Sequence, residues 1–208
     1  MEEFFRLAPA PWALAAGRKW HIFLSYRSTQ RKWVLGLYDI LTQLKYQVFM
    51  DQFVLVGGQG LASSLGDNLD ASEAGILVWS ARSEDSAWCR KEYDSFESRE
   101  SSGDFKFVAL RLNSAPLPGF VQGTLWIDCS EERDGLSGIS LLRLLYGLQG
   151  KPLPEQAVRL ATQIDEAAKN DMAAIQLFPP ASAFLDAIGG AMAAVAATEL
   201  LEATRRSN

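Results

Sequence analysis

One carboxylate in this sequence stands where a charge is costly. Glu92 lies in the polar stretch 83–93, which has the composition of a helix start. If this stretch is helical, Trp88, Glu92 and Phe96 recur every fourth residue and share a largely apolar stripe. A carboxylate on such a face requires a polar or cationic partner. Either the adjacent basic residues or the edge of a sheet satisfies Glu92, or this residue has a chemical role.

The composition of the chain excludes several classes of function. The chain has 208 residues, 48% of them hydrophobic and 22% charged, which is typical of a globular domain. Its net charge is −5 and it has no basic run, so we expect no direct binding of nucleic acid. Two cysteines, Cys89 and Cys129, and one histidine, His21, are too few and too dispersed for a metal site or a disulfide framework. We expect His21 and Cys89 to be packed residues, and we expect a cytoplasmic protein.

The elements that must position Glu92 follow a regular alternation. Helical spacing of apolar residues predicts helices over 31–44, 61–71, the stretch around Glu92 and 136–148. Short apolar runs predict strands over 20–25, 46–50, 75–80, 105–112 and 124–128. Five alternations of strand and helix predict an α/β fold with a parallel sheet that is covered by helices on both faces.

In such a sheet, ligands bind beyond the carboxyl ends of the strands. The residues that follow the predicted strands are expected to meet there: Tyr26, Arg27, Asp51, Ser80 and Asn113. Gly57 and Gly58, in a predicted loop over 51–60, allow close approach of a ligand to the backbone. Arg27 has the geometry to bind a phosphate, although it is equally able to pair with Asp51.

The two ends of the chain differ from this alternation. Residues 1–17 are interpreted as a loose N-terminal arm, and 18–150 as the α/β domain. Residues 151–208 are predicted to form a helical extension of two helices, for oligomerisation or as a linker. The second of these helices is rich in Ala and Gly, but its apolar core is too short to cross a bilayer, so no membrane role is expected.

Three motifs in this order resemble those of the TIR (Toll/interleukin-1 receptor) domain. They are FLSYR at 23–27, VFMD at 48–51 followed by Leu55 and Gly58, and SAWCRKE at 86–92. The resemblance covers about two thirds of the chain, from Arg18 to about Leu148. It implies a flavodoxin-like fold, which agrees with the alternation of strands and helices.

The resemblance also implies a function. Some TIR domains cleave NAD+ at the nicotinamide–ribose bond, and the glutamate of their W-x-x-x-E motif is catalytic, which corresponds to Glu92. NAD+ is then a substrate, and no cofactor or metal is expected. Tyr26, Arg27, Asp51, Gly57, Gly58, Ser80 and Trp88 are the expected substrate-binding residues, with simple packing as the alternative for Trp88.

Other TIR domains are non-catalytic scaffolds that signal by association with one another, and this is the alternative reading. In both classes the 51–60 loop is expected to mediate self-association, since its apolar residues Phe53, Val54 and Val56 are predicted to be exposed. The enzyme reading further implies activity on oligomerisation, in a bacterial antiphage or cell-suicide system that contains an upstream sensor or second-messenger module.

Overall fold

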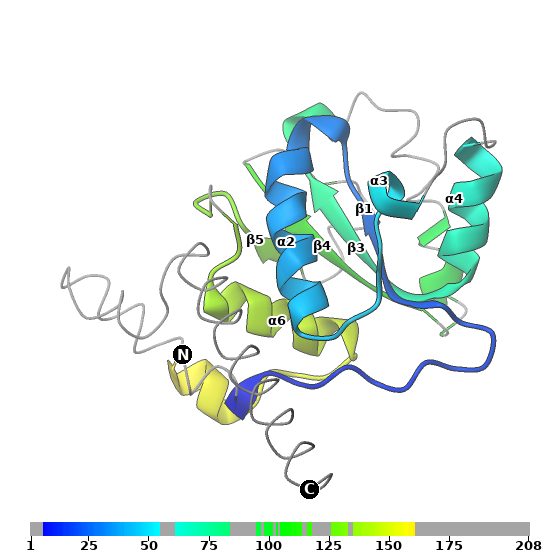
Figure 1. Ribbon diagram of the computed structural model, residues 1–208. Coiled ribbons are helices and arrows are strands. Elements are labelled where there is room, and N and C mark those ends of the chain that lie inside the picture. The colour runs from blue at the N-terminus through cyan, green and yellow to red at the C-terminus, as the bar shows by residue number, and fades with distance from the viewer. Residues whose placement is uncertain are drawn as a thin grey trace, which may run out of the picture.

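A five-stranded parallel sheet forms the centre of the molecule (Figure 1). The computed structural model describes residues 6–54, 61–83, 95–96, 98–101, 103, 105–113, 116–117, 126–132 and 135–160. The strands are β1 (Trp20–Ser25), β2 (Val48–Phe49), β3 (Ser72–Trp79), β4 (Lys106–Arg111) and β5 (Trp126–Asp128), in the spatial order β2-β1-β3-β4-β5. Every pairing is parallel. The predicted flavodoxin-like sheet is therefore confirmed.

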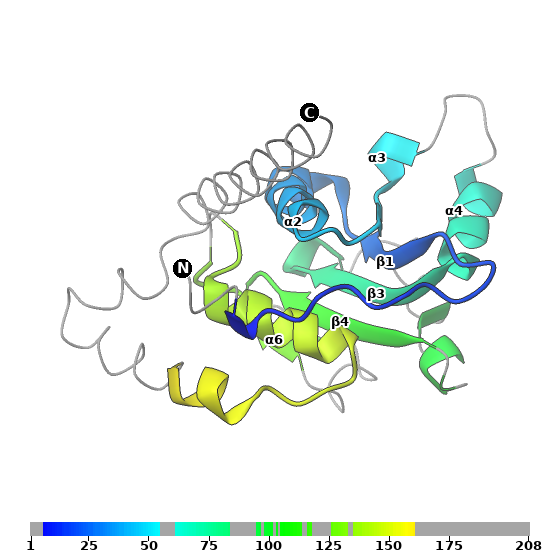
Figure 2. The same cartoon turned by 60° about the horizontal axis from the view of Figure 1, so that its bottom comes forward.

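Helices cover both faces of this sheet, because successive residues of each buried strand point to opposite sides. On one face, Ile22 and Ile76 pack with α2 (Arg31–Gln43) and α6 (Gly138–Leu148). On the other face, Phe23 and Leu77 pack with α4 (Leu61–Asp70) and with Phe96. Figure 2 shows α2 and α6 on one side of the sheet and α4 on the other. The buried apolar runs of the sequence are explained by this double covering.

Element boundaries differ from the predicted ones at β2. The expected strand over 46–50 is reduced to Val48–Phe49, because the chain leaves α2 through Lys45, which has a left-handed φ of 70°. The backbone N–H of Tyr46 then donates to Leu41 O at 3.0 Å, so Tyr46 closes the helix and is not part of the strand. The beginning of the predicted 51–60 loop is likewise a single helical turn, α3 (Asp51–Val54).

The N-terminal arm is not loose over residues 7–15, so that expectation was wrong. Leu7 is buried in the core, and its carbonyl accepts a hydrogen bond from the Tyr146 hydroxyl at 2.9 Å. The carbonyl of Pro9 accepts from the Tyr46 hydroxyl at 3.1 Å. These contacts tie the arm to α6 and to the turn after α2, at the amino-terminal edge of the sheet.

His21 is a packed residue, as expected. It is 5% exposed, and its ring contacts the arm and the strand beside it. Nδ1 accepts the backbone N–H of Gln47 at 2.9 Å, which leaves Nε2 to carry the proton and donate to Trp12 O at 2.8 Å. This geometry requires the neutral Nε2–H tautomer.

After α6 the chain turns back onto the domain. Residues 155–160 are helical, and Ala157 and Leu160 are buried against the face that α6 covers. The rest of the predicted two-helix extension, from residue 161 onward, lies outside the described residues. Among the described helices, none is long and apolar enough to cross a membrane.

Candidate functional site

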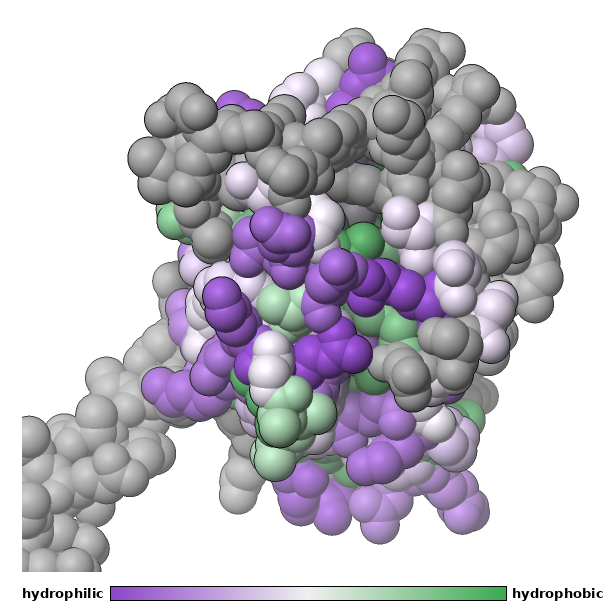
Figure 3. Space-filling model, turned by 90° about the vertical axis from the view of Figure 1, so that its right-hand side faces the viewer, coloured by the Kyte–Doolittle hydropathy of each residue, from purple (hydrophilic) through white to green (hydrophobic). Residues whose placement is uncertain are grey.

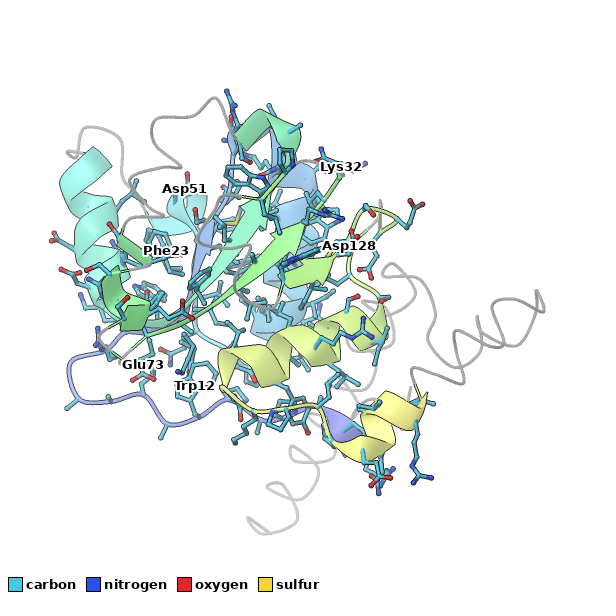
Figure 4. The ribbon with its side chains drawn as sticks, turned by 180° about the vertical axis from the view of Figure 1, so that it is seen from behind. Trp12, Phe23, Lys32, Asp51, Glu73 and Asp128 are labelled. Atoms are coloured by element: carbon cyan, nitrogen blue, oxygen red, sulfur yellow. The ribbon has the colours of Figure 1, made fainter. Side chains whose placement is uncertain are left out.

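The carboxyl edge of the sheet gathers the residues that follow the strands. Tyr26 follows β1, Asp51 follows β2, Ser80 follows β3 and Asn113 lies just beyond β4. Figure 4 shows Asp51 and Lys32 at this end of the sheet. The parallel topology thus brings together side chains that are up to 87 residues apart, from Tyr26 to Asn113.

Tyr26 and Asp51 are in direct contact. The Tyr26 hydroxyl donates to Asp51 Oδ1 at 2.6 Å. Burial raises the pKa of Tyr26 well above its ordinary value, and the hydrogen bond to the Asp51 carboxylate raises it further. The phenol therefore remains a neutral donor, and it orients the carboxylate at the start of α3.

The structure shows no ion pair between the described residues Arg27 and Asp51, which was the alternative to phosphate binding; the Asp51 carboxylate instead accepts the Tyr26 hydroxyl. The backbone N–H of Arg27 donates to Gln30 Oε1 at 2.9 Å, and this bond fixes the turn between β1 and α2. Arg27 is half-buried at the carboxyl edge. Its predicted role in binding a phosphate stays a prediction.

Ser80 belongs to a buried polar network. The Gln30 side-chain amide donates to Ser80 Oγ at 2.6 Å, and the Ser80 backbone N–H donates to Ser83 Oγ at 3.1 Å. Gln30, Ser80 and Ser83 are 8%, 7% and 1% exposed. The hydroxyl of Ser80 is therefore engaged with protein partners, and its substrate-binding role stays a prediction.

Sequence reasoning missed Gln30. It lies in a polar Ser-Thr-Gln segment that is typical of an exposed helix start, and only the tertiary fold brings it onto β3. There it connects the turns that follow β1 and β3 at the carboxyl edge. A satisfied buried network of this kind holds the turns after β1 and β3 in one arrangement.

A cavity of about 460 Å³ opens at this edge, on the side that α2 covers. Lys32 and Trp33 line it from the first turn of α2, and Glu132 lines it from the segment after β5. Trp33 is fixed by its indole N–H, which donates to the Glu132 backbone carbonyl at 2.8 Å. The remaining lining residues are Thr29, Gln30, Ser80, Leu112, Asn113, Cys129 and Ser130.

Seven of the ten lining residues have polar or charged side chains. Asn113 Oδ1 accepts the Ala81 backbone N–H at 3.0 Å. The Glu132 carboxylate accepts the backbone N–H and the hydroxyl of Ser137, both at 2.9 Å, and so holds in place the residue that caps the amino terminus of α6. Glu132 is thus committed to structure, and its carboxylate and the Lys32 ammonium give the lining one negative and one positive charge. A polar portion of a ligand suits such a lining.

Burial raises the pKa of the Cys129 thiol, and the nearby carboxylates of Glu132 and Asp128 raise it further. Cys129 is therefore not a nucleophile of this cavity, although it lines the wall. Among the described residues, no group of three or more histidine, cysteine or acidic side chains is arranged to hold a metal ion.

Glu92, Trp88, Gly57 and Gly58 lie outside the described residues. The chain enters the segment that contains Glu92 at Ser83, which ends the short helix η2 (Ala81–Ser83) at the carboxyl edge. It returns to the core at Phe96, which is fully buried among the rings of Phe23, Phe105 and Phe107. The burial of Phe96 agrees with its place on the predicted apolar stripe.

Comparisons with known proteins agree on one family. The family model described as TIR domain matches residues 22–142. Among solved structures, the chain is similar to the TIR domain of the Toll-related receptor TRR-2 from Hydra magnipapillata, with 16% sequence identity and a TM-score of 0.54. That match covers 63% of this chain and 99% of the Hydra domain. A comparison with curated proteins found no match.

Proposed function

Because this chain belongs to the TIR-domain family, we propose that it is an NAD+ glycohydrolase that cleaves the nicotinamide–ribose bond, with Glu92 as the catalytic residue. The observation that carries the proposal is the position of Glu92 in the W-x-x-x-E motif. This motif lies in the segment between Ser83 at the carboxyl edge and Phe96 in the core. Family membership alone fits both enzymes and scaffolds.

One carboxylate is sufficient for this chemistry. Nicotinamide leaves as a neutral molecule from a cationic precursor, so no general acid is needed, in contrast to the two carboxyl groups of ordinary glycosidases. A carboxylate near the ribose stabilises the positive charge that develops at the anomeric carbon, and this interaction strengthens toward the transition state. Water then attacks to give ADP-ribose, or a group of the substrate itself attacks to give a cyclic product.

The described residues of the carboxyl edge support binding of a dinucleotide. Arg27 offers a cation for the pyrophosphate, and Tyr26 holds the Asp51 carboxylate in a fixed position, where it is available to a ribose hydroxyl. The Gln30–Ser80 network keeps these turns rigid. Gly57, Gly58 and Trp88 complete the proposed substrate-binding set.

Association of several copies is part of the proposal. Phe53 in α3 is 59% exposed, and it is stacked on Tyr38 with the ring centroids 4.8 Å apart. An exposed aromatic pair of this kind favours a contact with a second chain. We propose that this contact completes the active site, so that activity rises on clustering by an upstream module in the bacterial cytoplasm, as part of an antiphage or cell-suicide response.

The same exposed pair favours a second candidate, a non-catalytic scaffold that signals through contacts between TIR domains. In that case Glu92 has a structural role only. The two candidates differ in one respect, which is whether removal of the Glu92 charge abolishes a reaction or leaves the behaviour of the protein unchanged.

The test is consumption of NAD+ by the full chain at high protein concentration. Glu92→Gln preserves the side-chain volume and removes the charge, and we expect at least about a hundredfold loss of rate. Glu155→Gln is the matched control, because Glu155 is an exposed residue paired with Arg159 outside the carboxyl edge. Equal rates in the wild type and Glu92→Gln, with both folded by circular dichroism, would exclude catalysis by Glu92.

A further inference from the structure

A second hollow lies at the opposite, amino-terminal edge of the sheet. It has a volume of about 390 Å³ and lies between the N-terminal arm, the start of β4 and the end of α6. Figure 4 shows Trp12 and Glu73 together at this end of the sheet, opposite Asp51 and Lys32. We name it the basal groove. Its lining residues are Trp12, Ala15, Arg18, Glu73, Lys106, Leu148, Gln149 and Lys151.

The arm forms one fixed wall of the basal groove. The indole N–H of Trp12 donates to Oε2 of Glu73, and the backbone N–H of Ala15 donates to Oε1 of the same carboxylate. Both oxygens of Glu73 therefore bind the arm. On its other side, Trp12 is held by His21, whose Nε2–H donates to the Trp12 carbonyl.

The basal groove is basic in an otherwise acidic protein. Arg18, Lys106 and Lys151 supply three positive charges and Glu73 one negative charge, which leaves a net charge of +2 among the lining residues. The whole chain carries −5. Figure 3 shows the side of the molecule on which α4 lies, where hydrophilic residues form most of the described surface.

The two lysines are not needed to cap α6. Two carbonyls of its last turn already accept backbone N–H groups, from Gly150 to Gly147 O at 2.9 Å and from Lys151 to Tyr146 O at 3.0 Å. Gly150 has a left-handed φ of 63°, which is the geometry of a helix end that is closed by the backbone. The two lysine charges are therefore not used by the helix end and remain available for a ligand. Arg18 also has protein partners, because its Nη1 donates to the Asp70 carbonyl and to the Ser72 carbonyl, the latter at 3.3 Å, which positions the guanidinium at the groove.

Contacts of the side-chain stems fix where these charges lie. A Cβ atom added at Gly150 would be 3.3 Å from Lys106 Cε, so the Lys106 stem packs over the turn after α6. The Lys151 ammonium donates to Gln149 Oε1 at 2.9 Å, which uses one of its three donors. Gln149 in turn donates to the Ala10 carbonyl of the arm at 2.9 Å. The groove is thus assembled from three separate parts of the chain that hold one another in place.

We propose that the basal groove binds a phosphate monoester, with the dianion held by Arg18, Lys106 and Lys151. Two positive net charges match the two negative charges of the ester, and guanidinium and ammonium donors are the usual partners of phosphate oxygens. The Trp12 and Leu148 side chains supply an apolar wall for the organic portion. Because the ligand contacts the arm, β4 and the turn after α6 together, binding stabilises the folded protein and fastens the arm to the domain.

The experiment is a titration of the full chain with glucose 6-phosphate at constant ionic strength, with glucose as the uncharged control. Binding is followed by NMR through the indole N–H of Trp12, assigned with Trp12→Phe, and through the backbone amides of Lys106 and Gly150. We expect saturable shifts at these groups with the ester and none with glucose. Inorganic phosphate should compete.

Lys106→Gln should weaken the affinity about tenfold or more, because it removes a charged hydrogen-bond donor. Arg159→Gln is the matched control, because it changes the net charge by the same amount but Arg159 lies outside the groove. This variant should bind the ester as tightly as the wild type does.

A second measurement, with vesicles that contain a phosphoinositide, distinguishes a lipid from a soluble phosphate ester as the ligand. Binding to these vesicles as well as to the soluble ester identifies a lipid headgroup. Absence of shifts at the groove, or equal weakening by both variants, would overturn the proposal. Circular dichroism of each variant excludes unfolding as the cause.

Discussion

Gly75 in the middle of β3 provides the space that Phe96 occupies, so Gly75→Ala should destabilise the protein. A Cβ atom at this position would be 2.9 Å from Cε2 and Cζ of Phe96 and 2.9 Å from Cζ of Phe105. Both rings are buried, at 0% and 2% exposure, and they pack against each other with 5.3 Å between centroids and an angle of 47° between their planes.

Overpacking of a closed core by one methyl group costs about 1–3 kcal/mol. With a urea m value of about 2 kcal/mol/M, the unfolding midpoint should fall by about 0.5–1.5 M. Phe96 follows Glu92 by four residues, so a displaced ring also shifts the segment that carries the proposed catalytic carboxylate. We therefore expect a loss of NAD+ cleavage in Gly75→Ala that exceeds the loss of folded protein.

Gly66→Ala in α4, on the same face of the sheet, is the matched control. A Cβ atom there meets nothing within 4 Å, and replacing a helical glycine by alanine stabilises by about 0.5–1 kcal/mol. In a Phe96→Leu background the penalty of Gly75→Ala should shrink, which a double-mutant cycle measures as coupling between the two sites. If Gly75→Ala unfolds at the same urea concentration as Gly66→Ala, the proposed packing of Phe96 on Gly75 is wrong.

Three further outcomes are expected from the described contacts. Burial raises the pKa of Tyr46 from near 10 to about 12, so the hydroxyl ionises at a lower pH in the unfolded chain than in the native protein. The urea midpoint should therefore fall as the pH rises above 10, and it should fall less steeply in Tyr46→Phe. A midpoint that is flat between pH 9 and 11.5 would contradict this. In a Cys89→Ser variant, the buried Cys129 thiol should not react with a thiol reagent at pH 8 until the protein is unfolded, and rapid native-state labelling would show that the site is open. Glu132→Ala should cost about 1–3 kcal/mol in urea unfolding, because Ser137, the residue that caps α6, loses the carboxylate that accepts its N–H and its hydroxyl. Glu131→Ala, at the exposed neighbour, should be neutral.

The sheet was predictable because its signals are local. Runs such as Trp20–Ser25 are short, continuous and apolar, and the helix after it shows regular spacing of inward residues such as Leu37 and Leu41. A parallel α/β arrangement follows from their alternation alone. The boundary error at Tyr46 arose because an aromatic residue that closes a helix has the same composition as the start of a strand.

The arm could not be predicted, because its contacts are distant in sequence. Leu7 and Ala10 bind Tyr146 and Gln149, each 139 residues away. No periodicity in the sequence relates such pairs. The prolines of the arm correctly indicate an irregular segment, but they do not indicate where on the domain that segment packs. The basal groove was missed for the same reason, since Arg18, Lys106 and Lys151 converge only in the folded chain.

The carboxyl edge was predicted in outline and not in detail. The rule for parallel sheets places Tyr26 and Asp51 on one rim, and the structure adds their hydrogen bond. It also shows that the Ser80 hydroxyl is directed into a buried network with Gln30, a contact across 50 residues. Residue types alone do not distinguish a hydroxyl that binds substrate from one that binds a neighbouring side chain.

The most direct test of the proposed function is release of nicotinamide from NAD+ by the wild-type chain, measured by chromatography across a range of protein concentrations and with a crowding agent. The account predicts one nicotinamide released for each NAD+ consumed, with a specific rate that rises with protein concentration and falls in Phe53→Ser. No release at any concentration, with the chain folded and associated, would contradict catalysis and identify the protein as a scaffold.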